Sequence, residues 1–228
     1  MPDPTKFLTH WKPVPLPRPT SLNGGGVRLE PLEAARHTTD LWKALVGHDE
    51  LWRWFRDGPH ANEASLGKAL EAKQADPASV FFAIVPAQTG RIAGYASLMR
   101  MDPLNGVIEV GNVMFSPALQ RTRAATEAMY LMAHHVFEEL GYRRYEWKCN
   151  AENEPSRHAA VRLGFTFEGI FRQHMVVKGC NRDTAWFAML DHEWPSRKCA
   201  FEAWLAPGNF DPSGQQLKSL AAIAAEQN

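Results

Sequence analysis

Residues 112–128 read NVMFSPALQRTRAATEA, and within them the chain changes from one secondary structure to another. The apolar run that ends at Phe115 is typical of a strand, and the alanine-rich run from Ala124 is typical of a helix. A proline and a basic polar turn separate the two runs. The first turn of a helix has backbone N–H groups without an intrahelical partner, and its dipole favours anions. Because Arg121 and Arg123 flank this turn, the segment predicts a phosphate-binding site.

A second segment further along the chain has the same character. Residues 150–156 read NAENEPS and precede a short helix that ends at Gly164. Pro155 suits the first turn of that helix. Asn153 and Ser156 are residue types that cap helix N-termini, so capping is one role expected of both.

Together, these two segments resemble the GNAT superfamily of acetyl-CoA-dependent N-acetyltransferases, and in particular its Rim-type branch, which includes ribosomal-protein N-terminal acetyltransferases. The predicted element order, β-α-α-β-β-β-α-β-α-β-β, matches the GNAT fold over residues 26–195. The resemblance implies an α/β (α+β) fold with a mixed, mostly antiparallel sheet of about seven strands flanked by helices. It also implies that the sheet splays apart between its fourth and fifth strands.

The hydrophobic pattern gives the expected boundaries. Strands are predicted at residues 27–32, 80–85, 92–99, 107–115, 144–149, 165–177 and 183–190. Helices are predicted at residues 34–46, 65–74, 124–140, 155–163, 194–205 and 215–226, with Ser65 as the candidate N-cap of the second. We divide the chain into a proline-rich arm (residues 1–25), an acetyltransferase domain (26–195) and a helical extension (196–228). The arm is expected to lie on the surface or to exchange with a partner subunit.

The composition narrows the class of protein. Lys and Arg together number 25, as do Asp and Glu, so the basic excess of a general nucleic-acid-binding protein is missing. No apolar run reaches the roughly 18 residues that span a membrane. The three cysteines are odd in number and form no CxxC pair, which favours reduced thiols over disulfides or zinc. With no signal-peptide pattern at the N-terminus, we expect a cytoplasmic protein without a metal, either a monomer or a homodimer.

In the family, a loop of the pattern Gln/Arg-x-x-Gly-x-Gly/Ala binds the coenzyme A pyrophosphate through its amides. Residues 120–125 match it here, except that Arg123 stands where glycine is usual. Arginine fits if its backbone stays in the right-handed region, and its guanidinium would then add charge toward the phosphate. The alternative is a solvated basic helix start. The resemblance thus implies acetyl-CoA as cofactor, bound by Gln120, Arg121, Thr122, Arg123, Ala124 and Ala125.

The resemblance further implies that strands 107–115 and 144–149 separate, so that their free backbone groups can pair with the pantetheine arm. The backbone of Val113, Met114 and Phe115 would then face the cofactor. An N–H near Met114 would stabilise the negative charge that develops on the thioester oxygen.

Residues of the second segment complete the implied cofactor site. Asn150 and Asn153 would contact pantetheine, and Ser156 would return a proton to the coenzyme sulfur. Many other GNAT enzymes use a tyrosine for that proton, but Ala160 occupies the matching position. A thiol with a pKa near 8.5 can also take its proton from solvent.

Glu109 is the candidate base that takes the proton of the acceptor amine. It lies in an apolar strand, where an unpaired carboxylate would be costly, and Rim-type enzymes often carry glutamate at this place. Its alternatives are pairing with an arginine or facing solvent at an edge.

Trp52, Trp54 and Asp49 are the candidate residues for the acceptor site, because the family places the segment after its first helix beside that site. They would form an aromatic, acidic mouth suited to a cationic amine; alternatively, the tryptophans are core residues. The expected reaction is direct acetyl transfer to a primary amine of a small molecule or aminoacyl compound. The alternatives are a protein or peptide N-terminus as acceptor, or a catalytically silent CoA-binding module.

Overall fold

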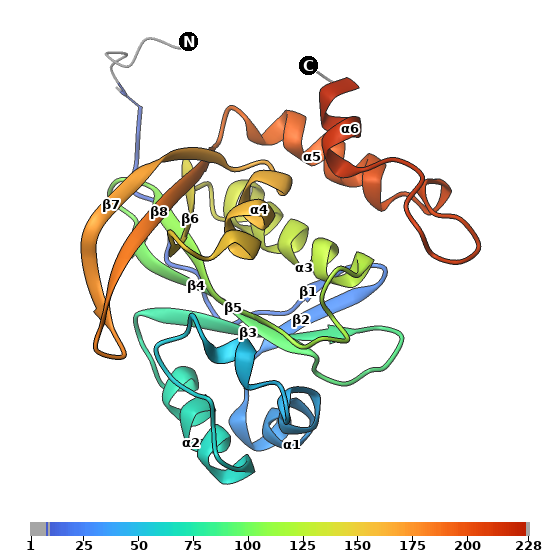
Figure 1. The fold of residues 1–228 in the computed structure, drawn as a ribbon. Coiled ribbons are helices and arrows are strands. Elements are labelled where there is room, and N and C mark those ends of the chain that lie inside the picture. The colour runs from blue at the N-terminus through green and yellow to red at the C-terminus, as the bar shows by residue number, and fades with distance from the viewer. Residues whose placement is uncertain (1–7, 9, 227–228) are drawn as a thin grey trace.

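The computed structural model describes residue 8 and residues 10–226. Its centre is one eight-stranded sheet with the strand order β1-β2-β3-β4-β5-β6-β8-β7 (Figure 1). The strands are β1 (Leu22–Asn23), β2 (Val27–Pro31), β3 (Ser79–Pro86), β4 (Gly94–Asp102), β5 (Val107–Phe115), β6 (Arg144–Asn150), β7 (Thr166–Val177) and β8 (Cys180–Leu190). Neighbouring strands are antiparallel except β5 and β6, which are parallel.

Helices cover both faces of the sheet (Figure 1). One face carries α1 (Ala34–Leu45) and α2 (Glu63–Gln74), and the other carries α3 (Arg123–His134), α4 (Glu154–Arg162), α5 (Trp194–Leu205) and α6 (Leu220–Glu226). Short 3-10 turns lie at Asp49–Trp52 and Pro207–Asn209. The predicted mixed sheet flanked by helices is confirmed, and the additional strand is β1, inside the segment expected to be an arm. No helix in the described part of the chain is long and apolar enough to cross a membrane.

Three helix boundaries differ clearly from the sequence-based expectation, and one of them is the start of the last helix, which is predicted at residue 215 and lies at Leu220. Ser65 does not cap α2; Asn62 does, and Ser65 completes the capping box from the third helical position. The helix expected to run to residue 140 changes at His135 into a π-helical turn that ends at Glu139. These differences are local, because the apolar faces that pack on the sheet are unchanged.

The arm packs against its own chain. Trp11 Nε1 donates to the Leu104 carbonyl at 2.8 Å, and Val14 N–H donates to the Pro103 carbonyl at 3.1 Å. A Cβ added at Gly106 would lie 2.4 Å from the Trp11 ring, so this glycine allows the close approach. The division of the chain into arm, domain and extension stays a prediction.

A glycine turn at residues 24–26 fixes α3 over the sheet. The Glu127 carboxylate on α3 accepts hydrogen bonds from Gly25 N–H at 2.7 Å and from Gly26 N–H at 2.9 Å. Any side chain at Gly24 would meet the same carboxylate, because an added Cβ lies 2.4 Å from Glu127 Oε1. The glycines therefore bind a carboxylate of the protein itself and hold the helix that follows β5.

Candidate active site

The parallel strands β5 and β6 pair over only part of their length. They are in register over residues 107–110 of β5 and 144–147 of β6. Beyond these positions β5 stays paired with β4 and β6 stays paired with β8, but β5 and β6 no longer pair with each other. We call this open end the splay, made of residues 111–115 and 148–150. The separation expected from the resemblance is confirmed, and its position is now defined.

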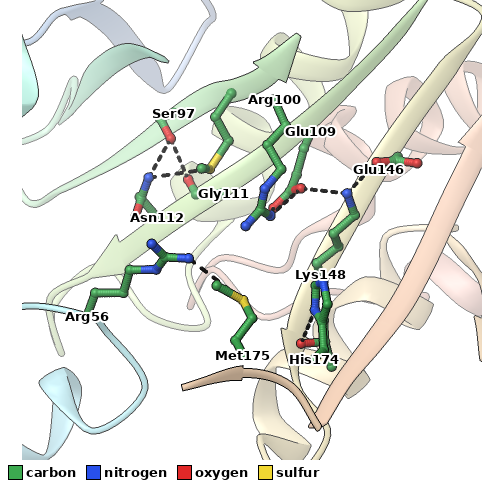
Figure 2. Close-up of polar contacts among 12 residues, drawn as sticks. Arg56, Ser97, Arg100, Glu109, Gly111, Asn112, Glu146, Lys148, His174 and Met175 are labelled. Carbon is green, nitrogen blue, oxygen red and sulfur yellow. Dashed lines mark hydrogen bonds and ion pairs between the residues drawn. The ribbon is translucent and has the colours of Figure 1, made fainter. Parts of the chain in front are cut away.

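A bulge in β5 lies at the start of the splay. Tyr95 is opposite Met114 and Ser97 is opposite Gly111, so two β5 residues face a single residue of β4. The first of the two is Asn112, whose φ of +50° is in the left-handed region. Its amide donates to Ser97 Oγ at 3.0 Å, and that hydroxyl donates to the Gly111 carbonyl at 3.1 Å (Figure 2). The side chains thus hold the bulge in place.

The bulge determines which backbone groups face the splay. Ser116 N–H donates at 2.9 Å to the carbonyl of Ala93, the residue just before β4. Because bonded pairs alternate along an antiparallel ladder, Met114 bonds to Tyr95, and its N–H points toward β4. The N–H groups of Val113 and Phe115 point the other way. This geometry disfavours Met114 as the oxyanion donor and favours its two neighbours.

The turn from β5 into α3 presents free backbone donors. Thr122 caps the helix, since its hydroxyl accepts from Ala125 N–H at 3.1 Å. Arg121 has a φ of +61°. The N–H groups of Arg121, Arg123 and Ala124 donate to no described residue. Such a turn at a helix N-terminus fits a phosphate group.

The Arg123 side chain corrects one expectation. Its backbone is helical, as a bound phosphate requires, and Arg121 takes the left-handed conformation instead. However, the Arg123 guanidinium donates to the Leu205 carbonyl and lies 4.9 Å from the Phe210 ring centroid. It points to the helical extension and not toward a phosphate. Gln120 Nε2 donates to the Phe115 carbonyl at 3.0 Å, so it ties the turn back to β5.

The turn from β6 into α4 contains the capping residues expected from the sequence. Asn153 Oδ1 accepts from Ser156 N–H at 3.2 Å, and Asn150 Oδ1 accepts from Glu152 N–H at 2.9 Å. The Ser156 hydroxyl accepts a hydrogen bond of 3.0 Å from Trp147 Nε1. Contacts with pantetheine or sulfur by these residues stay predictions.

Glu109 lies on the sheet face opposite α3 and α4, and its side chain is only 3% exposed. Arg100 Nη1 donates to both of its oxygens, at 2.8 and 2.7 Å, and Lys148 Nζ lies 2.9 Å from Oε2 (Figure 2). This is the arginine partnership that the sequence left open as an alternative. An amine can therefore reach Glu109 only through a water molecule or by displacing a cation.

The same sheet face carries a basic cluster that sequence reasoning missed. It consists of Arg56 from the loop after α1, Arg100 from β4, Lys148 from β6, His174 from β7 and Arg182 from β8. Lys148 Nζ also binds Glu146 at 2.6 Å and lies 3.8 Å from the Trp186 ring centroid. Partial burial, followed by the charges of Arg100, Arg182 and Lys148, lowers the pKa of His174. A signal was present in β6, where charged and apolar residues alternate along RYEWKCN.

The residues expected to form an acidic mouth take other positions. Trp52 is 3% exposed in the core beneath α1 and α2, with its ring centroid 4.6 Å from that of His60. This is the core role that the sequence left as the alternative. Trp54 is half-buried under the Arg53 guanidinium, and Asp49 is exposed. The face beside the splay is basic, because Arg56 and the other cations of the cluster lie there.

Comparisons with known proteins place the chain among acetyltransferases. A family model described as an acetyltransferase (GNAT) domain matches residues 27–166. A crystal structure of a GCN5-related N-acetyltransferase from Brucella melitensis aligns with a TM-score of 0.94 and 49% identity, over 96% of this chain and 100% of that one.

Two curated relatives match over shorter segments. The Bacillus subtilis protein YdaF, provisionally named a ribosomal N-acetyltransferase, is 29% identical over 48% of this chain and 59% of its own length. The ribosomal-protein-serine acetyltransferase of Escherichia coli is 30% identical over 36% of this chain and 45% of its own length. The chain thus spans about half the length of these curated relatives.

Proposed function

The chain belongs to the GNAT acetyltransferase family, and from this premise we propose that it transfers an acetyl group from acetyl-CoA to a primary amine. The family and the fold expected from the sequence are both confirmed. The observation that carries the proposal is the splay, because it leaves strand backbone groups unpaired beside two helix N-termini. We also propose a cytoplasmic location, which the three free cysteines support.

The residues present fit coenzyme A. Three N–H groups, of Arg121, Arg123 and Ala124, are available for the pyrophosphate. Along the splay, the N–H groups of Val113 and Phe115 are available for the pantetheine arm, which would add to β5 as a strand does. The Phe115 carbonyl is already bound by Gln120. The Arg123 guanidinium contributes indirectly, because it anchors the extension beside the turn.

When bound, acetyl-CoA would supply a thioester whose carbonyl carbon bonds to the amine nitrogen, while the C–S bond breaks and coenzyme A leaves as the thiolate. We assign the stabilisation of the developing negative oxygen to Val113 N–H, which the bulge directs into the splay. Because an α-amine has a pKa of about 7.7–8, a weak base suffices to remove its proton. Glu109 takes that proton through a water molecule, since its own oxygens are bound to Arg100 and Lys148. The Ser156 hydroxyl returns a proton to the coenzyme sulfur.

A small amine is the acceptor class that we favour. The Lys178 ammonium, at the turn between β7 and β8, donates to the Trp52 carbonyl at 3.0 Å and to the Gly58 carbonyl at 2.8 Å. The turn therefore contacts the loop that carries Arg56, and an extended peptide would have to displace this contact. The name of the Escherichia coli relative, a ribosomal-protein-serine acetyltransferase, favours a protein as the second candidate for the acceptor.

Acetyl-CoA binding and turnover test the proposal. We expect acetyl-CoA to raise the melting temperature, to bind in calorimetry, and to release thiol when a panel of amines and peptides is added. Glu109→Gln should lower kcat while acetyl-CoA affinity is retained. Binding without turnover of any acceptor would favour a silent CoA-binding module, and absence of binding would reject the proposal.

A further inference from the structure

The basic cluster holds more positive charge than the protein itself neutralises. The cations are Arg56, Arg100, Lys148 and Arg182. Among the described residues, the carboxylates that these four cations face are those of Glu109 and Glu146. Glu146 is also paired with Arg144, at 2.6 Å. The surplus lies on the sheet face that the splay opens onto, where the acceptor amine must approach Val113.

Two members of the cluster are neutralised within the protein. Lys148 lies between Glu109 and Glu146 and against the face of Trp186, and its side chain is only 5% exposed. Arg100 is bound to Glu109 through a single guanidinium nitrogen. These ion pairs fix both cations in place, because displacing either would leave Glu109 without one of its two partners.

Arg56 and Arg182 have no carboxylate partner among the described residues. The Arg56 side chain donates from Nη2 to Met175 Sδ at 3.7 Å (Figure 2). Arg182 makes no hydrogen bond or ion pair with a described residue, although its Nε is buried. Buried polar groups in proteins are normally bonded. Burial is the main cause that lowers the pKa of Arg182, and the nearby charges of Arg100 and Arg56 lower it further.

We propose that the acceptor is a small amine that carries a carboxylate or a phosphate, and that Arg56 and Arg182 bind this anionic group. A guanidinium matches both anions with paired N–H donors. The inference rests on the proposed function and names the substrate class of the same site. Nearby cations also favour the neutral form of the acceptor amine, which is the form that attacks.

The size of the acceptor follows from the Lys178 contacts. They join the β7–β8 turn, close to Arg182, to the loop that carries Arg56. The two proposed anion-binding arginines are therefore held by segments that touch each other. This arrangement suits a compact anion between them better than an extended chain.

Matched acceptor pairs test the inference. We would measure kcat/KM for amino acids against their C-terminal amides, for aminoalkyl phosphates against the parent amino alcohols, and for acidic and neutral tetrapeptides. The anionic member of a small pair should be preferred by about tenfold or more, as hydrogen bonds between charged groups imply. Comparing the first two sets distinguishes carboxylate from phosphate.

Variants assign the preference to the two arginines. Arg182→Gln and Arg56→Gln should each raise KM for the anionic amine by about tenfold and leave KM for its neutral partner little changed. Arg91→Gln is the control, because Arg91 is exposed, lies outside the cluster and makes no ion pair with a described residue. Arg56 is exposed, so its variant remains informative if Arg182→Gln folds poorly.

A titration of His174 by NMR gives a readout that does not depend on turnover. With coenzyme A in place of acetyl-CoA, the anionic amine should raise the pKa of His174, and its neutral partner should not.

Equal use of charged and neutral amines, with acetyl-CoA bound and consumed, would overturn the inference and leave the proposed function intact. A preference for acidic peptides over small anionic amines would overturn it too. If acetyl-CoA does not bind, or no amine is acetylated, the function and the inference fall together.

Discussion

The two ends of the β5–β6 pair are built from the same two strands and behave differently. At one end, residues 107–110 and 144–147 are joined as an ordinary parallel ladder. At the other end the strands part, although both remain bonded to their outer neighbours β4 and β8. Core packing continues on both faces through the change, although the bulge shifts the side-chain alternation of β5 by one residue: Val110 and Val113 pack toward α3, and Met114 packs in the core under α1 and α2. What distinguishes the open end is therefore the availability of its backbone.

Two devices lie where the strands part. The bulge at Asn112 adds one residue to β5 on the side of β4. Lys148, the first residue of β6 beyond the paired end, reaches back to Glu109 of β5 and Glu146 of β6. The bulge lies at the start of the open end, and the Lys148 ion pairs hold the last paired residues of β5 and β6 together. The comparison thus predicts that a substitution in the bulge and a substitution of Lys148 will affect stability and cofactor binding in different proportions.

Replacing Lys148 should have the largest effect on stability. Lys148→Met removes the cation that two carboxylates share, and the loss of a buried partner costs several kcal/mol. We expect about 3 kcal/mol, at the low end of that range, because Glu109 keeps Arg100 and Glu146 keeps Arg144. Urea denaturation measures the change.

The control for this prediction is Lys198→Met. Lys198 pairs with Glu138 at 3.1 Å at the surface, and such a pair contributes between 0 and about 1 kcal/mol. Adding Glu109→Gln to Lys148→Met should restore part of the loss. Strictly additive effects would contradict the shared ion pair.

Changing the bulge should reduce stability less than Lys148→Met does, and it should reduce acetyl-CoA binding more. Asn112→Val places a β-branched residue at positive φ and removes the hydrogen bond to Ser97, at a combined cost of about 2 kcal/mol. Because Val113 would lose its direction into the splay, acetyl-CoA affinity should fall by about tenfold or more, which corresponds to about 1.4 kcal/mol.

Asn112→Gly separates conformation from hydrogen bonding. Glycine adopts positive φ without strain, so this variant should be somewhat less stable than the native protein and should still bind acetyl-CoA. Calorimetry measures the acetyl-CoA affinity of Asn112→Val and Asn112→Gly. If both bind the cofactor as the native protein does, the bulge is not what directs the donor.

The difference between the two ends also explains what the sequence could predict. The strand-to-helix turns at residues 116–125 and 150–156 carry local signals, namely proline, capping residues and a change of periodicity. These signals predicted the fold and the turn that we propose for the cofactor. The direction of the Arg123 guanidinium could not be predicted, because its partner, Leu205, is far along the chain and no local pattern links the two.

The basic cluster could not be predicted in the same way. Arg56, Arg100 and Arg182 come from three separate segments, and only strand pairing brings them together. Trp52 was ambiguous for a similar reason: a tryptophan after a helix fits a core or a binding site equally well, and burial decides between them. Local pattern therefore predicted the backbone elements, while the side-chain cluster needed the register of the sheet.

A smaller effect is expected from Ser156, which lies at the open end. Ser156→Ala leaves Trp147 Nε1 without its acceptor and should cost about 1 kcal/mol of stability. If the hydroxyl also returns a proton to sulfur, kcat should fall, but by no more than about tenfold, since a thiol of pKa near 8.5 can be protonated by water. Trp147→Phe is the matched variant, because it removes the N–H and keeps the hydroxyl. Equal kcat values for these two variants would remove Ser156 from the chemistry.

The smallest effect belongs to the paired end, where Arg144 binds Glu168 of β7 at 2.8 and 2.5 Å. This hydrogen bond lowers the pKa of Glu168 below its ordinary value of 4.5. A carboxyl whose pKa is lower in the folded state stabilises the fold above the unfolded-state pKa, and this contribution is lost as the pH falls through the folded-state value. The side chain is 40% exposed, so screening limits the contribution to about 0.5 kcal/mol. Glu168→Gln should therefore be slightly less stable than the native protein at pH 7, and the gap should close below pH 4.5 in urea denaturation. A gap that widened in acid would show that the folded protein raises the pKa of Glu168, so that burial of the carboxyl outweighs its pairing with Arg144.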